Sequence, residues 1–234
     1  EADERQFQVF DATCPLVAKV HAEVVSLKER GFQIIMIGHR GHPEVEGTMG
    51  QVDSSIHLIE HVSDVDKLSF GKDDLLAYVT QTTLSVDETM EAVNILKERF
   101  PEIQSPPSDD ICYATQNRQE AIKEIAPQAD LVIVVGSQNS SNSVRLAEVA
   151  LEYGAKASHL IDYAEEIQDH WFEGVETIGV TSGASVPEIL VKDVLATLHE
   201  HGFHDVQEVT AAEESLLFAL PPELRKDMKA AGQA

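Results

Sequence analysis

Hydrophobic residues along this chain form short continuous runs that are separated by stretches with helical spacing. The runs QIIMIG (33–38) and LVIVVG (131–136) are apolar at nearly every position, as in strands buried on both faces of a parallel sheet. After Pro15, five apolar residues fall on one face of a predicted helix: Leu16, Val17, Val20, Val24 and Leu27. Gly31 is a natural end for that helix. Residues 86–100 and 186–202 predict further helices, so the pattern is typical of an α/β protein.

The chain also repeats itself. Cys14 and Cys112 each precede a helical stretch and a strand that ends in glycine, and 24 residues separate Cys14 from Gly38 and Cys112 from Gly136. HLIE (57–60) is answered by HLID (159–162), and TTLSVDE by SGASVPE 100 residues later. A period this long indicates duplicated α/β units, each β-α-β-α with a parallel sheet, rather than a solenoid. We expect the units at 9–108 and 109–202, joined near the Pro-rich PEIQSPPSDD.

The last part of the chain, 203–234, fits neither unit. Its apolar run SLLFAL, ahead of Pro221, predicts a strand that completes another sheet.

Charge and cysteine content exclude several classes of function. The chain has 41 Asp and Glu against 17 Lys and Arg, so it should repel nucleic acid and anionic membranes, and local donors must hold any phosphate that it binds. No apolar run approaches the roughly 20 residues of a spanning helix, and the polar first residues are not typical of a signal peptide. Two cysteines are too few for a disulfide framework, which favours a reducing interior.

Cys14 and Cys112 each lie where a helix is expected to begin. A single intracellular cysteine is often a small buried hydrophobe. The positive helix end and the matched register instead favour a thiolate that binds metal. Two thiolates do not complete an iron-sulfur site, which takes four cysteines, or three with one iron left open.

The loop GHRGHPEVEGTMGQ carries His39, His42, Glu44 and Glu46. Three interpretations are open: a zinc site, although no cysteine lies nearby; a histidine that binds an anion beside a carboxyl group that delivers a proton; and a polar helix cap.

A second polar loop, GSQNSSNSVRLAEVA, places Ser140, Ser141, Asn142 and Ser143 ahead of a helix whose apolar positions include Leu146, Val149 and Tyr153. One of these residues should cap the helix, and the others form an anion site suited to phosphate.

The segments TQTTLSVDE and TSGASVPE follow strands. Ser85 with Glu88, and Ser185 with Glu188, match the capping box S-x-x-E, which leaves Thr82 and Thr83 unexplained. The chain contains no P-loop, no GxGxxG motif and no Ser-His-Asp order.

Six motifs together resemble the 4-hydroxy-3-methylbut-2-enyl diphosphate reductase family. In chain order, from about residue 10 to about residue 191, they are FDATCPLVAKVH, GHRGHPEVEGTMGQ, TQTTLSVDET, DDICYATQNRQEA, GSQNSSNSVRLAE and GVTSGASVPEILV, and the tail PPELR is also similar to that family's end. The resemblance implies three α/β lobes around a 4Fe-4S cluster, and the reductive removal of an allylic hydroxyl to give isopentenyl and dimethylallyl diphosphates, the last step of the non-mevalonate pathway.

By this resemblance Cys14 and Cys112 are cluster ligands, Glu44 is the proton source and Thr82 orients the substrate hydroxyl. The diphosphate clamp would consist of His42, Thr83, Ser140, Ser141, Asn142 and Ser185. The implied partners are the allylic diphosphate and a one-electron donor such as ferredoxin or flavodoxin, in a bacterial cytoplasm rather than a plastid.

The chain departs from the family in lacking the N-terminal lobe, which carries a third cysteine and further diphosphate-binding histidines. Because the retained motifs are intact, we interpret the chain as a fragment whose tail would complete that lobe. The alternatives are a catalytically silent diphosphate-binding homologue without a cluster, and a different cluster or zinc enzyme built on the same repeat.

Overall fold

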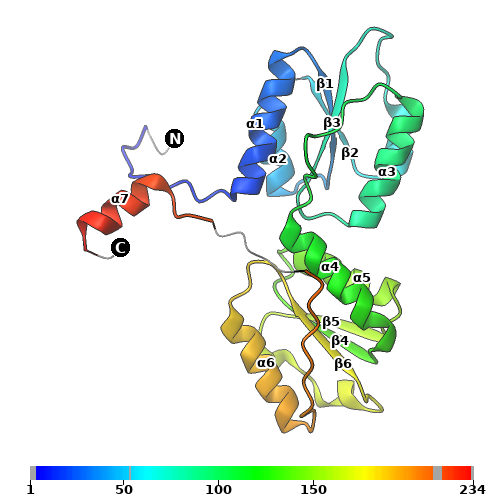
Figure 1. Ribbon diagram of the computed structural model, residues 1–234, viewed down its shortest axis with the longest axis vertical. Helices are drawn as coiled ribbons and strands as arrows, with labels where there is room; N and C mark the ends of the chain where they lie inside the picture. Colours follow the sequence, from blue (N-terminus) through cyan, green and yellow to red (C-terminus); the bar gives the residue numbers. More distant parts are fainter. Residues whose placement is uncertain (1–3, 53, 213–217, 233–234) are drawn as a thin grey trace.

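The computed structural model describes residues 4–52, 54–212 and 218–232, and it contains two α/β units that lie one above the other along its longest axis (Figure 1). In the first unit, β1 (Gln33–Ile37) lies between β2 (Ile56–Ile59) and β3 (Leu76–Thr80), and all pairs are parallel. Its helices are α1 (Pro15–Glu29), α2 (Pro43–Met49) and α3 (Val86–Arg99), with a 3-10 helix, η1 (Val62–Lys67).

The second unit has the same topology. β4 (Leu131–Val135) lies between β5 (Ala157–Ile161) and β6 (Ile178–Ser182), again in parallel. The helices of this unit are α4 (Tyr113–Ile125), α5 (Ser141–Glu152) and α6 (Glu188–Glu200), with three short 3-10 helices, Ala126–Gln128, Ala164–Glu166 and Asp169–Phe172. The expectation of repeated parallel α/β units is confirmed, with three strands in each described sheet rather than two. β2 and β5 lie at sheet edges and each carries a half-buried histidine, which makes their apolar runs short.

Each sheet is covered on both faces, as its continuous apolar strands require. In the first unit Ile35 and Ile37 pack toward α3, whereas Ile34 and Met36 pack toward α1 and α2. The second unit repeats this arrangement: alternate residues of β4 pack toward α4 and α5 on one face and toward α6 on the other. Both units are therefore three-layered.

Most helix boundaries follow the sequence signals. Pro15 is the first residue of α1, and Gly31, just past its end, has a φ of 83°, which a glycine adopts at little cost. Leu146 and Val149 are buried on α5 as expected, but Tyr153 lies at the end of that helix, 38% exposed, with its hydroxyl donating to Asp87.

The prediction that Ser185 caps a helix is wrong, because the sheet register differs from the alignment of the two sequence repeats. Thr80 pairs with the last residue of β1 and Ser182 with the last residue of β4, so equivalent positions lie 102 apart rather than 100. Ser185 therefore corresponds to Thr83, and the residue equivalent to the N-cap Ser85 is Pro187, the N-cap of α6, which makes no side-chain cap.

The segment after α6 leaves the second unit and ends in α7 (Pro222–Ala230), beside residues 4–10 and away from both sheets (Figure 1). Gln8 donates a hydrogen bond of 2.7 Å to the carboxylate of Asp227 on α7. Of the predicted strand SLLFAL, residues 215–217 lie outside the described residues, and residues 218–220 are not in a strand. No helix in the described part of the chain has the length and hydrophobicity needed to cross a membrane.

Two leucines on α5 test the packing of the second unit. Leu146 is fully buried, so we expect Leu146→Ala to lower the free energy of unfolding by about 2 to 5 kcal/mol through lost contacts and a residual cavity. Leu151 is 51% exposed on the same helix, and Leu151→Ala should change it by less than about 0.5 kcal/mol. Urea unfolding followed by circular dichroism measures both, and equal losses would contradict the packing described here.

Candidate functional site

The carboxyl edges of the two sheets meet, and the predicted site residues other than the cysteines follow these strand ends. The hydroxyls of Thr83, after β3, and Ser141, after β4, are 2.6 Å apart. A cleft of about 980 Å³ lies at this junction, and its walls include His42, Thr83 and Ser141. A ligand in this cleft would contact residues from both units.

Glu44, in the first turn of α2, is held by Thr82. The backbone N–H of Thr82 donates to one carboxylate oxygen at 2.6 Å, and its hydroxyl donates to the other at 3.0 Å. Burial raises the pKa of Glu44, the two bonds from Thr82 act in the opposite direction, and the negative charge of Asp110 adds to the increase. Glu44 therefore retains its proton to a higher pH than an ordinary glutamate does.

His42 is the N-cap of α2, and its Nδ1 accepts the backbone N–H of Glu44 at 3.2 Å. Burial, and then the charge of His39, lower the pKa of His42, which favours the neutral ring. Because Nδ1 is the acceptor, the hydrogen of the neutral ring is on Nε2, which can donate to an anion. No group of three or more His, Cys, Asp or Glu suited to a metal ion occurs among the residues that the structure describes, and the zinc interpretation of this loop gains no support.

The first turn of α5 supplies the remaining polar groups. Ser140 is the N-cap, and its Oγ accepts the backbone N–H of Ser143 at 3.4 Å. The amides of Ser141 and Asn142 have no carbonyl partner within the helix because they lie in its first turn. Asn142 is 4% exposed; its Oδ1 accepts a hydrogen bond, whereas its Nδ2 is buried without a partner.

The strand ends around α5 must carry glycine. A Cβ at Gly136 or Gly183 would overlap the side chain of Ser143, so the loops after β4 and β6 both pack tightly against the first turn of α5. Ser185 lies two residues past Gly183 and is exposed. Among the described residues, no hydrogen bond joins Ser185 to another predicted site residue.

Both cysteines are free thiols at helix N-termini. Cys14 is the exposed N-cap of α1, and Cys112 is the half-buried N-cap of α4. The backbone N–H of Thr115 donates to the Cys112 sulfur at 3.3 Å, and the Cys112 backbone N–H donates to the carbonyl of Thr82 at 2.9 Å. Cys112 is thus connected through Thr82 to Glu44.

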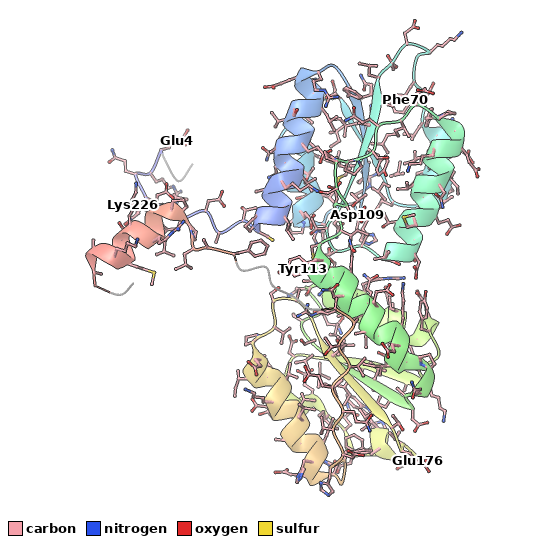
Figure 2. The ribbon with its side chains drawn as sticks, in the orientation of Figure 1. Glu4, Phe70, Asp109, Tyr113, Glu176 and Lys226 are labelled. Atoms are coloured by element: carbon pink, nitrogen blue, oxygen red, sulfur yellow. The ribbon has the colours of Figure 1, made fainter. Side chains whose placement is uncertain are left out.

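A buried ion pair fixes the chain that leads to Cys112. The Asp110 carboxylate, which is fully buried, accepts the backbone N–H of Thr80 at 3.0 Å and the ammonium group of Lys19 at 3.2 Å. The same ammonium donates to the carbonyls of Ser108 and Asp109. Figure 2 shows Asp109 and Tyr113 at the junction of the two units. Lys19, on the helix whose N-cap is Cys14, therefore holds the segment that precedes Cys112.

Three buried polar residues of the site were not predicted from the sequence: Gln81, Asp110 and Thr115. Gln81 is fully buried; its Oε1 accepts the His39 N–H at 3.0 Å, and its Nε2 donates to Thr83 at 2.9 Å and to Ser141 at 3.4 Å. It connects the strand ends of both units. Their positions were the one indication of a role in the site, since each of the three lies within three residues of a predicted site residue. Burial could not be predicted, because an isolated polar residue has no periodic pattern that reveals it.

Comparison with known proteins gives one consistent result. The LytB protein family matches residues 1–199. The chain is 60% identical over 227 residues to a 4-hydroxy-3-methylbut-2-enyl diphosphate reductase of Leifsonia xyli subsp. xyli, covering 97% of this chain and 67% of that protein. A reductase of the same name from Acidothermus cellulolyticus is 56% identical over 233 residues, covering 100% and 68%.

Solved structures agree. The structure of the E-1-hydroxy-2-methyl-but-2-enyl-4-diphosphate reductase from Plasmodium falciparum superposes with a TM-score of 0.92 at 36% identity, covering 99% of this chain and 73% of that one. A structure described as (E)-4-hydroxy-3-methyl-but-2-enyl diphosphate reductase, the terminal enzyme of the non-mevalonate pathway, gives a TM-score of 0.54 at 32% identity, covering 85% and 70%.

The raised pKa of Glu44 predicts how stability depends on pH. Above the ordinary value of 4.5 the folded protein retains a proton that the unfolded chain has lost, so the free energy of unfolding falls as pH rises toward the folded-state pKa. Each unit of pKa increase corresponds to about 1.4 kcal/mol. Glu44→Gln removes this contribution and should make the decline between pH 4.5 and pH 7.5 shallower in urea unfolding.

Glu46→Gln is the matched control, because Glu46 is exposed on the same short helix. It should leave the wild-type decline unchanged. A Glu44→Gln protein that loses stability with pH as steeply as the wild type would contradict the account of Glu44.

Proposed function

This chain belongs to the LytB family of 4-hydroxy-3-methylbut-2-enyl diphosphate reductases, and we propose that its cleft binds the substrate diphosphate while Glu44 protonates the departing hydroxyl. The reaction is the terminal step of the non-mevalonate pathway of isoprenoid biosynthesis. Overall, two electrons and two protons convert the allylic alcohol to an alkene: the C–O bond breaks, one proton leaves in water with the hydroxyl oxygen, and the other is added to carbon. The products are isopentenyl and dimethylallyl diphosphates.

One observation carries this proposal: Thr82 contacts both the buried carboxyl group of Glu44 and the backbone of Cys112. A protonated carboxyl group beside a thiol that can ligate metal is what a reductive dehydroxylation requires, because electrons and a proton must reach one carbon–oxygen bond.

Cys14 and Cys112 have the donor chemistry that an iron-sulfur cluster requires, but two cysteines are fewer than such a cluster needs. Both are free thiols, each caps a helix whose backbone N–H groups can donate to a ligand sulfur, and Cys112 already accepts one such bond. We propose that they are two of the three cysteine ligands of a 4Fe-4S cluster. The third comes from a part of the protein outside these 234 residues, which contain two cysteines. When bound, the cluster supplies the two electrons one at a time.

The diphosphate would be held by neutral donors. His42 offers its Nε2–H group. The positive end of α5 offers hydroxyl, amide and backbone N–H groups from Ser140, Ser141 and Asn142. The Thr83 hydroxyl lies 2.6 Å from that of Ser141. Ser185 occupies the position in the second unit that Thr83 occupies in the first, which supports a role for Ser185 in the same clamp. Such a clamp binds an anion although the chain carries a net charge of −24.

Glu44 and Thr82 would deliver the proton. Burial raises the pKa of Glu44, so a larger fraction of its carboxyl group is protonated near neutral pH than in an exposed glutamate. The Thr82 hydroxyl, 3.0 Å from that carboxyl group, can accept its hydrogen while donating its own to the substrate oxygen. In this way the proton moves from Glu44 to the leaving hydroxyl without passing through water.

The electron donor is proposed to be a one-electron carrier such as ferredoxin or flavodoxin, because the cluster accepts electrons singly. The reductases of Leifsonia xyli and Acidothermus cellulolyticus are bacterial, which supports the proposal of a bacterial cytoplasm.

We further propose that residues 9–108 and 109–202 are two lobes of a three-lobed protein and that residues 203–234 contribute to the third. The segments beside α7 support this, since they expose large apolar side chains that a further lobe would cover: Phe7, Val9, Phe10, Phe218 and Leu220. The chain spans about two thirds of the length of the curated relatives.

The proton-donor role predicts a specific loss in the full-length gene product reconstituted anaerobically with iron and sulfide. Glu44→Gln should keep its iron content and its affinity for the substrate, because the amide still fills the pocket, but kcat should fall by at least about 100-fold. Glu46→Gln is the control and should keep wild-type turnover. Unimpaired turnover of Glu44→Gln, measured with a reduced one-electron donor, would reject Glu44 as the proton donor.

The ligand role of the cysteines predicts the loss of the cluster. In the same full-length protein, Cys14→Ala or Cys112→Ala should prevent assembly, so that bound iron and the visible absorbance of the cluster are lost. Ser26→Ala, an exposed substitution on α1, should leave both at wild-type values. Normal iron content in either cysteine variant would overturn the assignment, and a wild-type protein that binds inorganic pyrophosphate but no iron would support the silent diphosphate-binding alternative.

A further inference from the structure

Thr115, in the first turn of α4, contacts a proposed cluster ligand and a proposed clamp residue at the same time. It is completely buried, its Oγ1 lies 3.1 Å from the Cys112 sulfur, and its hydroxyl donates to Oδ1 of Asn142 at 3.2 Å. We propose that Thr115 is a positioning residue that sets the orientation of the Asn142 amide, so that Asn142 presents its N–H₂ group to the substrate diphosphate. This inference rests on the proposed function and assigns a role to a residue that the clamp does not include.

The side chain of Asn142 has one satisfied end and one unsatisfied end. Its oxygen accepts from Thr115, whereas its Nδ2 is buried and has no hydrogen-bond partner. A buried N–H₂ group without an acceptor is unfavourable, and a protein that retains one usually pairs it with a ligand. Asn142 lies in the first turn of α5, where the helix end favours an anion, so a diphosphate oxygen is the acceptor that fits.

Thr115 determines which end of the amide faces the ligand. An asparagine side chain can turn by about 180° and exchange its oxygen and nitrogen at small steric cost. The Thr115 hydroxyl donates its hydrogen to Asn142, whereas the Cys112 sulfur, which is a thiolate when it ligates a metal, accepts the backbone N–H of Thr115. This bond requires Oδ1 on the Thr115 side and directs Nδ2 away from it. With valine at position 115 this bond would be lost, and the amide could turn its oxygen toward the anion, where the interaction is repulsive.

The position of Thr115 also explains how a hydroxyl on α4 can orient an amide on α5. α4 and α5 pack against each other, and Thr115 and Asn142 both lie in first turns, so the positive ends of two helices lie close together. The backbone N–H of Thr115, which donates to the Cys112 sulfur, is independent of the side chain. Removal of the hydroxyl should therefore disturb the clamp, while the backbone hydrogen bond to the Cys112 sulfur is retained.

The test is a double-mutant cycle in the full-length, cluster-loaded protein, with inorganic pyrophosphate as the probe and calorimetry as the readout. Thr115→Val should weaken pyrophosphate binding by about tenfold and keep the wild-type iron content. Thr115→Ser, which retains the hydroxyl, should restore binding to within about twofold of the wild type. Thr48→Val is the matched control: Thr48 is also fully buried, but its hydroxyl has no partner, so binding should not change.

The cycle separates positioning from a general structural effect. If Thr115 acts through Asn142, the variant Thr115→Val/Asn142→Ala should bind pyrophosphate as weakly as Asn142→Ala alone, within about twofold. Additive losses, wild-type binding by Thr115→Val, or failure of Thr115→Ser to restore binding would each overturn the inference. A wild-type protein that does not bind pyrophosphate would reject the proposed clamp itself, which is a different outcome from a wild-type protein that binds while Thr115→Val binds equally well.

Discussion

The proposed diphosphate clamp depends on one constraint: the carboxyl edges of two parallel sheets must meet. The contact between the Thr83 and Ser141 hydroxyls, at 2.6 Å, lies at that junction, and buried Gln81 supports it from the end of β3. Parallel strands place their following loops at one edge, so two such sheets brought edge to edge direct loops of both units toward one cleft, which is lined by residues that follow β1, β2, β3 and β4. The duplicated topology therefore builds a site from residues that lie 58 and 60 positions apart in the chain.

The two cations among the described residues that line the cleft, Arg40 and Arg145, are paired with carboxylates, so the junction offers mainly neutral donors to an anion. A chain with a net charge of −24 would repel a diphosphate at long range, but the cleft can hold one through helix ends, hydroxyls and a neutral histidine. One cation near the cysteines, Lys19, is already committed to the buried Asp110 carboxylate and two carbonyls. Its role is thus to hold the segment before Cys112, and removal of Lys19 would leave the buried Asp110 carboxylate without its cation.

Much of the architecture could be predicted from the sequence, because burial on both faces of a parallel sheet leaves a strong apolar signal in β1 and β4. The equivalence of Cys14 and Cys112 in the two units could also be predicted from the sequence. The alignment of Ser185 with Ser85 was wrong because the motifs match at an offset of 100 residues, whereas β3 and β6 are equivalent at an offset of 102, which makes Pro187 the counterpart of Ser85; only the strand pairing reveals this. A third strand in each unit was missed, since β2 and β5 are half-buried edges interrupted by histidine.

The main site residues could be predicted from the sequence, but the contacts that support them could not. Glu44, Thr82 and the Ser140–Asn142 turn lie in motifs that a reader can align, whereas Gln81, Asp110 and Thr115 are significant only because they are buried, and burial of a lone polar residue has no pattern in the sequence. These three residues share one physical property: each contacts at least two other polar groups at once. A buried polar group with two or more partners fixes their relative orientation, because any displacement leaves at least one of them unpaired. The precision of the proposed chemistry therefore depends on these residues as much as on those that contact the substrate.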